Sequence, residues 1–488
     1  MTALTPDLCV IGAGSGGLAV AAGAVQMGAS VVLVERGRMG GDCLNYGCVP
    51  SKSLLAAAKL AHAWRRGGEF GLVYAPPQID FAAVGDSVER FIARLAPTDS
   101  AERFERLGVR VIAAEARFLD PRTVRATPTL PSPASGGGSG RGVSTGDMLI
   151  RPRRFVIASG SAPFTPPIPG VDGVPFFTNE TVFANRVLPE HLVVIGGGPI
   201  GVELAQAHRR LGAAVTIIDA GPLLPRDDPE LVALLAARLV EDGIVLKTGV
   251  AVAAAAQVGT AIAVTLATGE RVEGSHLLIA AGRRPALAAL DLAAAGIDAN
   301  SAGIVVNSRL RTTNRRAYAI GDAAGGPQFT HVALYHAGIV IRNTLFRLPS
   351  RVDYRALPWV TYTDPELAQV GISEAAARET GPVRVLRWPF ADNDRAHTER
   401  DNSGEVKIVV SRRGRILGVT ILGAGAGDLI LPWALAISQR LKIGAMANLI
   451  MPYPSRGDAG KRAAASFYTP TLFGPWTRRL VRLLARFG

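Results

Sequence analysis

Cysteine is scarce in this chain, with three residues in 488. A content this low excludes the disulfide scaffold of small secreted domains and favours a reducing compartment, so we expect a cytoplasmic protein. Long hydrophobic runs are also missing: no stretch of about 18 apolar residues occurs, and no membrane-spanning helix is expected. The N-terminus has neither a basic region nor a cleavage site before its first apolar run, so no secretory signal is expected.

Lysine is scarce too, although the chain is strongly basic. Only six of the 53 basic residues are lysine, and the net charge is +13. The arginines are spread along the sequence without aromatic interleaving or an RNA-binding motif, so nucleic-acid binding is not expected. The charge instead favours anionic substrates or anionic membrane surfaces. A chain of 488 residues with 48% hydrophobic content predicts several globular domains.

Glycine is abundant and marks an internal repeat. The runs LCVIGAGSGGLAVAAGAVQMGASVVLVER and LVVIGGGPIGVELAQAHRRLGAAVTIIDAG share one pattern: an apolar strand, a G-x-G-x-x-G turn, a helix, and a second strand that ends in an acid. The glycines and acids of the two runs are Gly12, Gly14, Gly17 and Glu35 in the first, and Gly196, Gly198, Gly201 and Asp219 in the second.

This pattern predicts two dinucleotide-binding sites in an α/β fold. The three glycines permit a tight turn, close approach of a pyrophosphate, and close packing of helix on strand, while the acid binds a ribose diol. Two sites in one chain suggest FAD and a nicotinamide nucleotide. The carboxylate of Asp219 favours a free 2′-hydroxyl over a 2′-phosphate, and Arg226, seven residues later, is too distant to reverse this. NADH is therefore expected in preference to NADPH.

The stretch GGDCLNYGCVPSK places Cys43 and Cys48 five positions apart. Five residues of ideal helix rise ~7.5 Å, whereas a disulfide needs Cα atoms about 4.4–6.8 Å apart. A bridge would therefore need a distorted helix start, which Gly47 and Pro50 permit, before the helix continues through SKSLLAAAKLAHAW. Thiols near a helix N-terminus and Lys52 should have lowered pKa values, which suits redox exchange.

Two cysteines alone make a poor zinc site, so no resident metal is expected. Cys9, on the first strand, is expected to be a buried apolar residue.

GGDCLNYGCVPSK resembles the redox-active disulfide motif of the flavoprotein disulfide reductases, which include dihydrolipoamide dehydrogenase, glutathione reductase and mercuric reductase. The resemblance extends over roughly residues 5–470. GGGPIGVELA is similar to the nicotinamide motif, RPRRFVIASGSAP to the strand leaving the FAD domain, LLIAAGRRPAL to the end of the nicotinamide domain, AYAIGDAAGGPQFTHVALYHAG to the second FAD motif, and VDYRALPWVTYTDPELAQVGIS to the start of the interface domain.

The resemblance implies an oxidoreductase that is a homodimer. It divides the chain into an FAD domain (1–165 and 285–349, with a flexible insertion at 127–147), a nicotinamide domain (166–284), an α+β interface domain (350–470) and a basic amphipathic tail (471–488). FAD would be held by Gly12, Gly14, Gly17, Glu35, Gly41, Lys52, Ser159, Gly160, Asp322 and Ala333, with Asp322 on the ribityl chain. NAD would be held by Gly196, Gly198, Gly201, Asp219 and Gly282.

The resemblance also assigns catalytic roles. Cys48 would be the thiol beside the flavin, and Cys43 the thiol that attacks substrate. Lys52 and Glu203 would form an ion pair near the flavin atom that receives hydride. We expect both thiol pKa and access to favour Cys43 as the reactive group.

The segment MPYPSRGDAGKRAA departs from the pattern of dihydrolipoamide and glutathione reductases. Tyr453 and Asp458 stand where those enzymes carry a histidine and a glutamate. A phenol is a poor base at neutral pH, and no motif places the spare histidines, His331, His336 and His397, at the cysteine pair. A tyrosine at this position resembles mercuric reductases, yet the sequence has neither their vicinal C-terminal cysteines nor a Cys-x-x-Cys.

These features leave three alternatives for the reaction. The first is electron transfer from NADH to a disulfide or soft-metal substrate, with a thiol as product or substrate, as in a mercuric-reductase-like enzyme. The second is an atypical dihydrolipoamide dehydrogenase, which oxidises dihydrolipoamide on a lipoyl protein. The third is a quinone or partner protein at a membrane, because the final stretch WTRRLVRLLARFG is predicted to form a basic amphipathic helix. That helix would either dock on the protein's own surface or attach to the inner face of a membrane.

Overall fold

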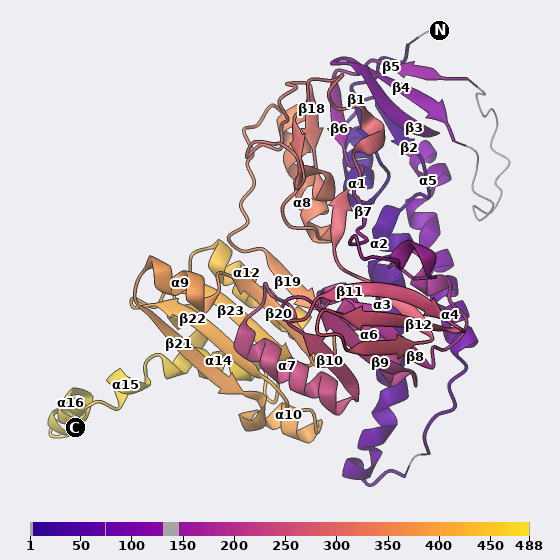
Figure 1. Cartoon of the computed structure of the whole chain (residues 1–488). Coiled ribbons are helices and arrows are strands. Elements are labelled where there is room, and N and C mark those ends of the chain that lie inside the picture. Colours follow the sequence, from indigo (N-terminus) through magenta and orange to yellow (C-terminus); the bar gives the residue numbers. More distant parts are fainter. Residues whose placement is uncertain (1–2, 74, 130–145, 488) are drawn as a thin grey trace. The chain divides into compact units, whose positions relative to one another are not determined.

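The computed structural model describes residues 3–73, 75–129 and 146–487. The chain forms two compact units: unit 1 comprises residues 1–54, 80–188 and 277–352, and unit 2 comprises residues 55–79, 189–276 and 353–488. Both units combine helices with sheets (Figure 1), and the predicted α/β class is confirmed. Among the described residues, no helix is long and apolar enough to span a bilayer.

Unit 1 is built on a seven-stranded sheet in the order β18-β6-β1-β2-β3-β4-β5. The pairs from β18 to β3 are parallel, and β3-β4 and β4-β5 are antiparallel. The strands are β1 (Leu8–Ile11), β2 (Val31–Glu35), β3 (Arg110–Asp120), β4 (Thr123–Pro128), β5 (Met148–Ile150), β6 (Arg154–Ile157) and β18 (Ala317–Ala319). Two small sheets pair β7 (Ser161–Pro163) with β15 (Arg283–Pro285), and β16 (Ala299–Asn300) with β17 (Gly303–Ile304).

The helices of unit 1 follow the predicted repeat. They are α1 (Ser15–Gln26), α2 (Gly41–Asn45), the start of α3 (Cys48–Ala63), α4 (Phe81–Leu95), α5 (Ala101–Arg106) and α8 (Thr330–Thr344). The predicted strand, glycine turn, helix and second strand are thus confirmed as β1, α1 and β2. The predicted helix after the cysteines is confirmed as α3.

Strand β1 forms the centre of the core of unit 1. Leu8 and Val10 belong to one hydrophobic cluster with residues of α1 and α8, and Cys9 and Ile11 belong to a cluster on the opposite face. Such burial on both faces is typical of a parallel strand covered by helices. Cys9 is fully buried, as predicted, and burial raises the pKa of its thiol to about 12.

Unit 2 contains the second glycine turn. Its parallel strands β10, β9 and β8 adjoin β14 in one sheet, and β11, β12 and β13 form an antiparallel sheet. These elements are β8 (His191–Ile195), α6 (Pro199–Arg210), β9 (Ala214–Asp219), α7 (Pro229–Glu241), β10 (Ile244–Thr248), β11 (Val252–Val258), β12 (Ala261–Leu266), β13 (Arg271–Gly274) and β14 (His276–Ile279), the last at the boundary of the units. The second copy of the repeat is confirmed as β8, α6 and β9.

The C-terminal part of unit 2 is a five-stranded antiparallel sheet in the order β19-β20-β23-β22-β21. Its strands are β19 (Pro358–Thr361), β20 (Glu366–Gly371), β21 (Val383–Pro389), β22 (Glu405–Ser411) and β23 (Ile416–Gly423). Its helices are α9 (Glu374–Thr380), α10 (Asp394–Thr398), α11 (Ala426–Leu429), α12 (Leu431–Ser438), α13 (Ile443–Ala447), α14 (Gly457–Ser466), α15 (Thr469–Leu472) and α16 (Pro475–Leu484).

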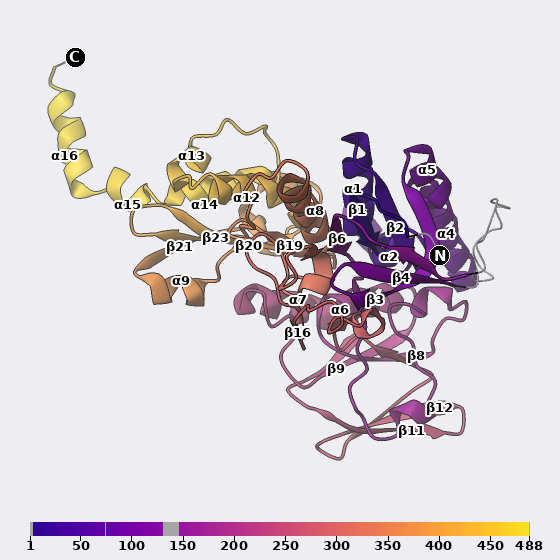
Figure 2. The same cartoon turned by 90° about the horizontal axis from the view of Figure 1, so that it is seen from above.

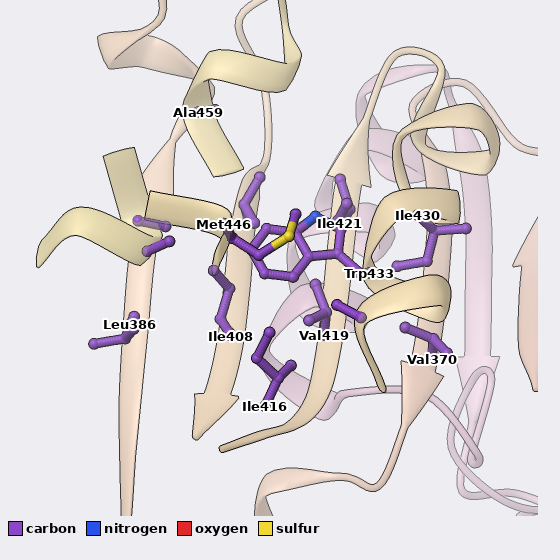
Figure 3. Packing of buried hydrophobic residues seen from close by; sticks show 14 of the residues in the cluster. Val370, Leu386, Ile408, Ile416, Val419, Ile421, Ile430, Trp433, Met446 and Ala459 are labelled. Carbon is purple, nitrogen blue, oxygen red and sulfur yellow. The ribbon is translucent and has the colours of Figure 1, made fainter. Parts of the chain in front are cut away.

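Helices cover one face of this sheet and form a single apolar core with it. Figure 3 shows Trp433 of α12 and Met446 of α13 lying against Ile408 of β22 and Ile421 of β23. All four side chains are buried. Burying such side chains is the main stabilising contribution to an antiparallel sheet that is covered on one side.

The predicted insertion at 127–147 falls largely outside the described residues, since 130–145 are not among them. The strands that flank it, β4 and β5, pair antiparallel, with Val124 opposite Ile150 and Ala126 opposite Met148.

Candidate active site

The third glycine of each predicted motif is where helix and turn meet most closely. A Cβ at Gly17 would lie 1.9 Å from the carbonyl oxygen of Gly12, and a Cβ at Gly201 would lie 1.9 Å from that of Gly196. Gly12 and Gly196 also have positive φ angles of 103° and 120°. No side chain fits at the third position, and the first requires a conformation that L-residues rarely adopt. The same steric pattern in both units confirms that the two turns are structural copies.

The second glycine of each motif caps the following helix. Gly14 precedes α1 with φ −77° and ψ 179°, and Gly198 precedes α6 with φ −77° and ψ 178°. Apart from neighbours along the chain, the nearest described atom to a Cβ built at Gly14 is the Gly41 Cα, at 3.9 Å, and none lies within 4 Å of one built at Gly198. Each helix therefore presents its free N–H groups beside an open backbone surface, which is the arrangement that binds a pyrophosphate.

The acid at the end of each second strand reaches back to the glycine turn. Glu35 accepts a hydrogen bond from the Ala13 N–H at 2.5 Å, and Asp219 accepts one from the Gly197 N–H at 2.6 Å. These bonds fix each carboxylate beside its turn, where its remaining lone pairs can accept bonds from ribose hydroxyls.

The residues predicted to hold the rest of FAD fit a polar ligand. The Ser159 hydroxyl is buried and has no hydrogen-bond partner in the described structure, so a bound group would complete it. Ser161 donates to Asp322 at 2.5 Å, and burial raises the pKa of the Asp322 carboxyl. The buried ring of His336 accepts the Gly321 N–H at 3.1 Å and so fixes the turn before Asp322; burial lowers the pKa of His336 to about 4.

The other predicted cofactor residues lie at turns or close contacts. Gly160 and Gly282 have φ angles of 68° and 122°. Ala333 lies on α8, where its Cβ would be 3.1 Å from a Cβ built at Gly16 of α1. The close approach of α1 and α8 therefore depends on small residues on both helices.

The two cysteines belong to different short elements, as the predicted distortion requires. Cys43 lies in α2 and Cys48 begins α3, with a break at Tyr46, whose φ is −139°. A Cβ at Gly47 would be 2.8 Å from an Asp42 side-chain oxygen. Both cysteines are free thiols in this structure and interact with each other.

The pKa values of the Cys43 and Cys48 thiols shift in opposite directions. The hydrogen bond from Cys43 lowers the pKa of Cys48 to about 6, and Thr330 and Lys52 contribute in the same direction. The bond with Cys48 and burial raise the pKa of Cys43. The expectation of a lowered pKa is thus confirmed for Cys48 and wrong for Cys43, because one thiolate stabilised by its neighbour's S–H opposes a second ionisation. Cys48 is exposed and Cys43 is half-buried in this structure.

The cysteine turn is fixed directly against the first glycine turn. The Gly40 N–H donates to the Ala13 carbonyl at 3.0 Å. A Cβ at Gly41 would be 2.6 Å from the Gly14 Cα, and Gly41 has a φ of 59°. Cys43 therefore lies two residues beyond a backbone contact with the predicted FAD site.

Arg283 is a site residue that the sequence analysis missed. Its guanidinium donates to Asp42 at 3.0 Å, to the Ser161 hydroxyl at 2.8 Å and to Asn179 at 3.1 Å. Since Ser161 donates to Asp322, this network connects the cysteine turn with the second FAD motif. Arg283 directly follows Gly282 in LLIAAGRRPAL, so its position was available from the motif, but its partners were not.

Thr330, the first residue of α8, is a second missed residue. Its hydroxyl lies 3.4 Å from the Cys48 sulfur. Thr330→Val is expected to raise the pKa of Cys48 by about one unit, because a hydrogen bond to a charged group contributes about 1.5 kcal/mol. The thiolate exists above this pKa and is lost as pH falls through it, so its midpoint would move up from about 6.

A pH titration of thiolate absorbance in the reduced protein measures this midpoint. Thr330→Ser keeps the hydroxyl and should leave the midpoint within a few tenths of a unit. Equal midpoints in the valine variant and the wild type would show that Thr330 does not stabilise the thiolate.

Of the other predicted catalytic residues, Lys52 lies in α3 in unit 1, and Glu203, Tyr453 and Asp458 lie in unit 2. The buried carboxylate of Glu203 accepts the Tyr362 N–H at 2.8 Å. Tyr453 is 73% exposed and donates to Asp394 at 2.9 Å, a bond that raises the pKa of the phenol. Asp458 pairs with Arg462 at 2.6 Å. A phenol held in this way keeps its proton at neutral pH, which agrees with the prediction that Tyr453 is a poor base.

The two other spare histidines have partners of their own. His331 stacks on Phe329 with ring centroids 5.2 Å apart, and the His397 ring contacts the Ala391 carbonyl. Neither contact involves a cysteine.

Comparison with known proteins identifies close similarity along nearly the whole chain. A family model described as pyridine nucleotide-disulphide oxidoreductase matches residues 6–337, and the dimerisation domain of that family matches residues 357–464. The chain is 36% identical to a mercuric reductase of Streptomyces lividans over 469 residues, covering 94% of this chain and 96% of the relative. It is 33% identical to a dihydrolipoyl dehydrogenase of Geobacillus stearothermophilus over 483 residues, covering 95% and 96%. The solved Cu(II) complex of the HOCl-induced flavoprotein disulfide reductase RclA from Escherichia coli is similar, with a TM-score of 0.84 at 26% identity and coverage of 96% and 100%.

Proposed function

Because the chain belongs to the pyridine nucleotide-disulphide oxidoreductase family, we propose that this FAD-dependent enzyme uses NADH to reduce a disulfide or soft-metal acceptor through Cys43 and Cys48. The observation that carries the proposal is the position of the pair. The cysteine turn rests on the glycine turn of the FAD site, and one of its two thiols is held as a thiolate. Bound FAD supplies two-electron transfer between the nicotinamide and this pair.

The cysteines themselves can complete disulfide exchange with balanced atoms. The Cys43 sulfur, after passing its proton to Cys48, attacks one sulfur of the substrate disulfide and releases the first thiolate, which takes up that proton. The Cys48 thiolate then attacks the Cys43 sulfur, closes the Cys43–Cys48 disulfide and releases the second thiolate. The stabilised thiolate of Cys48 is the group that makes the closing step favourable.

We further propose a homodimer in which Tyr453 and Asp458 complete the site of the other subunit. The dimerisation domain of the family supports this arrangement. Tyr453 would serve as a hydrogen-bond donor to a departing thiolate or to a metal-bound ligand, because its phenol remains protonated. This proposal includes an ion pair between Lys52 and Glu203. It also includes the division of the chain into FAD, nicotinamide and interface domains.

Acceptor identity is best tested by parallel rate measurements. NADH oxidation would be followed with a small disulfide, with Hg(II) and without acceptor, and NAD reduction would be followed with dihydrolipoamide. The proposal expects disulfide or Hg(II) turnover that is lost in Cys43→Ser. Rapid NAD-dependent oxidation of dihydrolipoamide would favour the lipoyl alternative, and quinone reduction that survives Cys43→Ser would favour the membrane electron-transfer alternative.

The preference for NADH depends on the charge of Asp219. Asp219→Asn is expected to raise the ratio of kcat/KM for NADPH to that for NADH by about 10–100-fold, because it removes repulsion of a 2′-phosphate worth about 1.4–2.7 kcal/mol. Steady-state kinetics with both nucleotides measure the ratio. Arg226→Gln is the control and should leave it unchanged, since Arg226 is exposed and interacts with Asp227 instead. A wild-type enzyme that prefers NADPH would contradict the assignment.

A further inference from the structure

The C-terminal helix α16 separates charge from apolar side chains completely. At about 100° per residue, Arg478, Arg479, Arg482 and Arg486 fall within one arc of about 100° around the helix axis. The opposite arc of about 160° holds the apolar residues Trp476, Leu480, Val481, Leu483, Leu484 and Phe487. The last two positions of this set, Arg486 and Phe487, continue the helical pattern just past the helix end, with the Phe487 N–H bonded to the Leu484 carbonyl.

The charge of this segment has one sign. Asp458 is the last acidic residue of the sequence, and six basic side chains follow it. Residues 459–487 therefore hold no acidic side chain that could neutralise the arginines within this segment. The guanidinium carbon of Arg479 lies 5.5 Å from the centroid of the Trp476 ring, and both side chains are exposed.

The apolar face of α16 is left largely exposed by the other described residues. Trp476 is 80% exposed and Phe487 81% exposed, and the leucines between them are exposed as well. Figures 1 and 2 both show α16 extending away from the five-stranded sheet at the C-terminal end of unit 2. The Thr477 hydroxyl bonds back to Thr471, just before the helix. The predicted alternative, docking of the tail on the protein's own surface, is thus not seen within the part of the chain that the structure describes.

We propose that α16 binds the surface of an anionic lipid bilayer. An apolar arc with a terminal tryptophan and phenylalanine suits the boundary between headgroups and acyl chains. The opposite arc of arginines would lie at the level of anionic headgroups, where each basic residue adds to binding. Two binding partners of α16 are distinguished by their charge. A second copy of this basic tail would repel the arginines of α16, whereas an anionic lipid surface attracts them.

Vesicle flotation of the FAD-loaded enzyme tests this proposal. We expect it to float with phosphatidylcholine vesicles that contain phosphatidylglycerol, and not with phosphatidylcholine alone. Replacing Arg478, Arg479 and Arg482 with glutamine should lower the partition coefficient roughly 100-fold, at about fivefold per arginine. Leu480→Glu with Leu484→Glu should abolish flotation. None of these variants should change NADH-dependent turnover, because α16 carries no residue assigned to the active site.

A matched control replaces Arg412, Arg413 and Arg415 with glutamine. These exposed arginines lie in the turn between β22 and β23, and their loss changes the net charge by the same amount. Partition equal to wild type in this control would assign binding to α16 and not to net charge. Absence of wild-type flotation, equal flotation without anionic lipid, or flotation that survives truncation after Gly474 would each overturn the proposal. If the truncation instead converts a dimer to a monomer, α16 covers a second copy.

Discussion

Replacing Cys48 with serine is expected to abolish NADH-dependent disulfide reduction, with kcat lower by about 10⁴-fold or more. Serine cannot close a disulfide with Cys43, and its hydroxyl is not ionised near neutral pH, whereas the pKa of Cys48 is about 6. Stopped-flow and steady-state rates with a small disulfide measure the loss. Flavin content and the rate of flavin reduction by NADH should stay near wild type, because both nucleotide turns are built without this side chain.

Cys9 provides the matched control for this prediction. It is fully buried in β1, and its pKa is raised to about 12, so it has no part in exchange. Cys9→Ala should retain turnover within about twofold. A Cys48→Ser enzyme that still reduces disulfides at a tenth of the wild-type rate would show that electrons reach the acceptor by another route.

Removing the charge of Arg210 is expected to produce the largest loss of stability. The guanidinium, almost fully buried, bonds to Asp242 at 2.8 Å and to Asp364 at 2.6 Å. Arg210→Met would leave the Asp242 carboxylate buried with weaker compensation from Arg238 at 3.5 Å and from Gln206 at 3.0 Å. Breaking a buried pair costs about 3–5 kcal/mol, and the remaining partners place the cost near 3. For a unit of this size, that corresponds to a Tm lower by about 6–12 °C.

Differential scanning fluorimetry or calorimetry measures this change. Arg271→Ala removes an exposed arginine that pairs with Glu273 at 2.9 Å, and it should cost no more than about 1 kcal/mol. If the two variants melt at the same temperature, the buried network around Asp242 does not stabilise unit 2.

The fold and the nucleotide turns were predictable because they depend on local patterns. The first glycine of each motif, Gly12 or Gly196, has a positive φ angle. The third, Gly17 or Gly201, has no space for a side chain. The G-x-G-x-x-G spacing places a glycine at both positions, so the sequence alone indicates both requirements. The family and the FAD-dependent activity inferred from GGDCLNYGCVPSK are confirmed by the comparisons. Sequence identity alone does not identify the electron acceptor, since a mercuric reductase and a dihydrolipoyl dehydrogenase are almost equally similar to this chain.

What the sequence could not predict depends on contacts between distant segments. Thr330 lies 282 residues from Cys48, and Arg283 lies 241 residues from Asp42. The raised pKa of Cys43 likewise follows from how two thiols share one proton, which spacing does not specify. Motifs locate such residues on the chain, but only packing shows which polar groups meet.

The central claim is that the cysteine pair is a second redox centre beside the flavin, and anaerobic titration with NADH tests it most directly. The absorbance spectrum of the purified enzyme would be followed beside those of Cys43→Ser and Cys48→Ser. The account predicts a long-wavelength thiolate-to-flavin band in the wild type and consumption of about two equivalents of NADH per FAD on full reduction. Complete bleaching of the flavin after about one equivalent, with the variants behaving like the wild type, would contradict the account and remove the cysteines from the electron path.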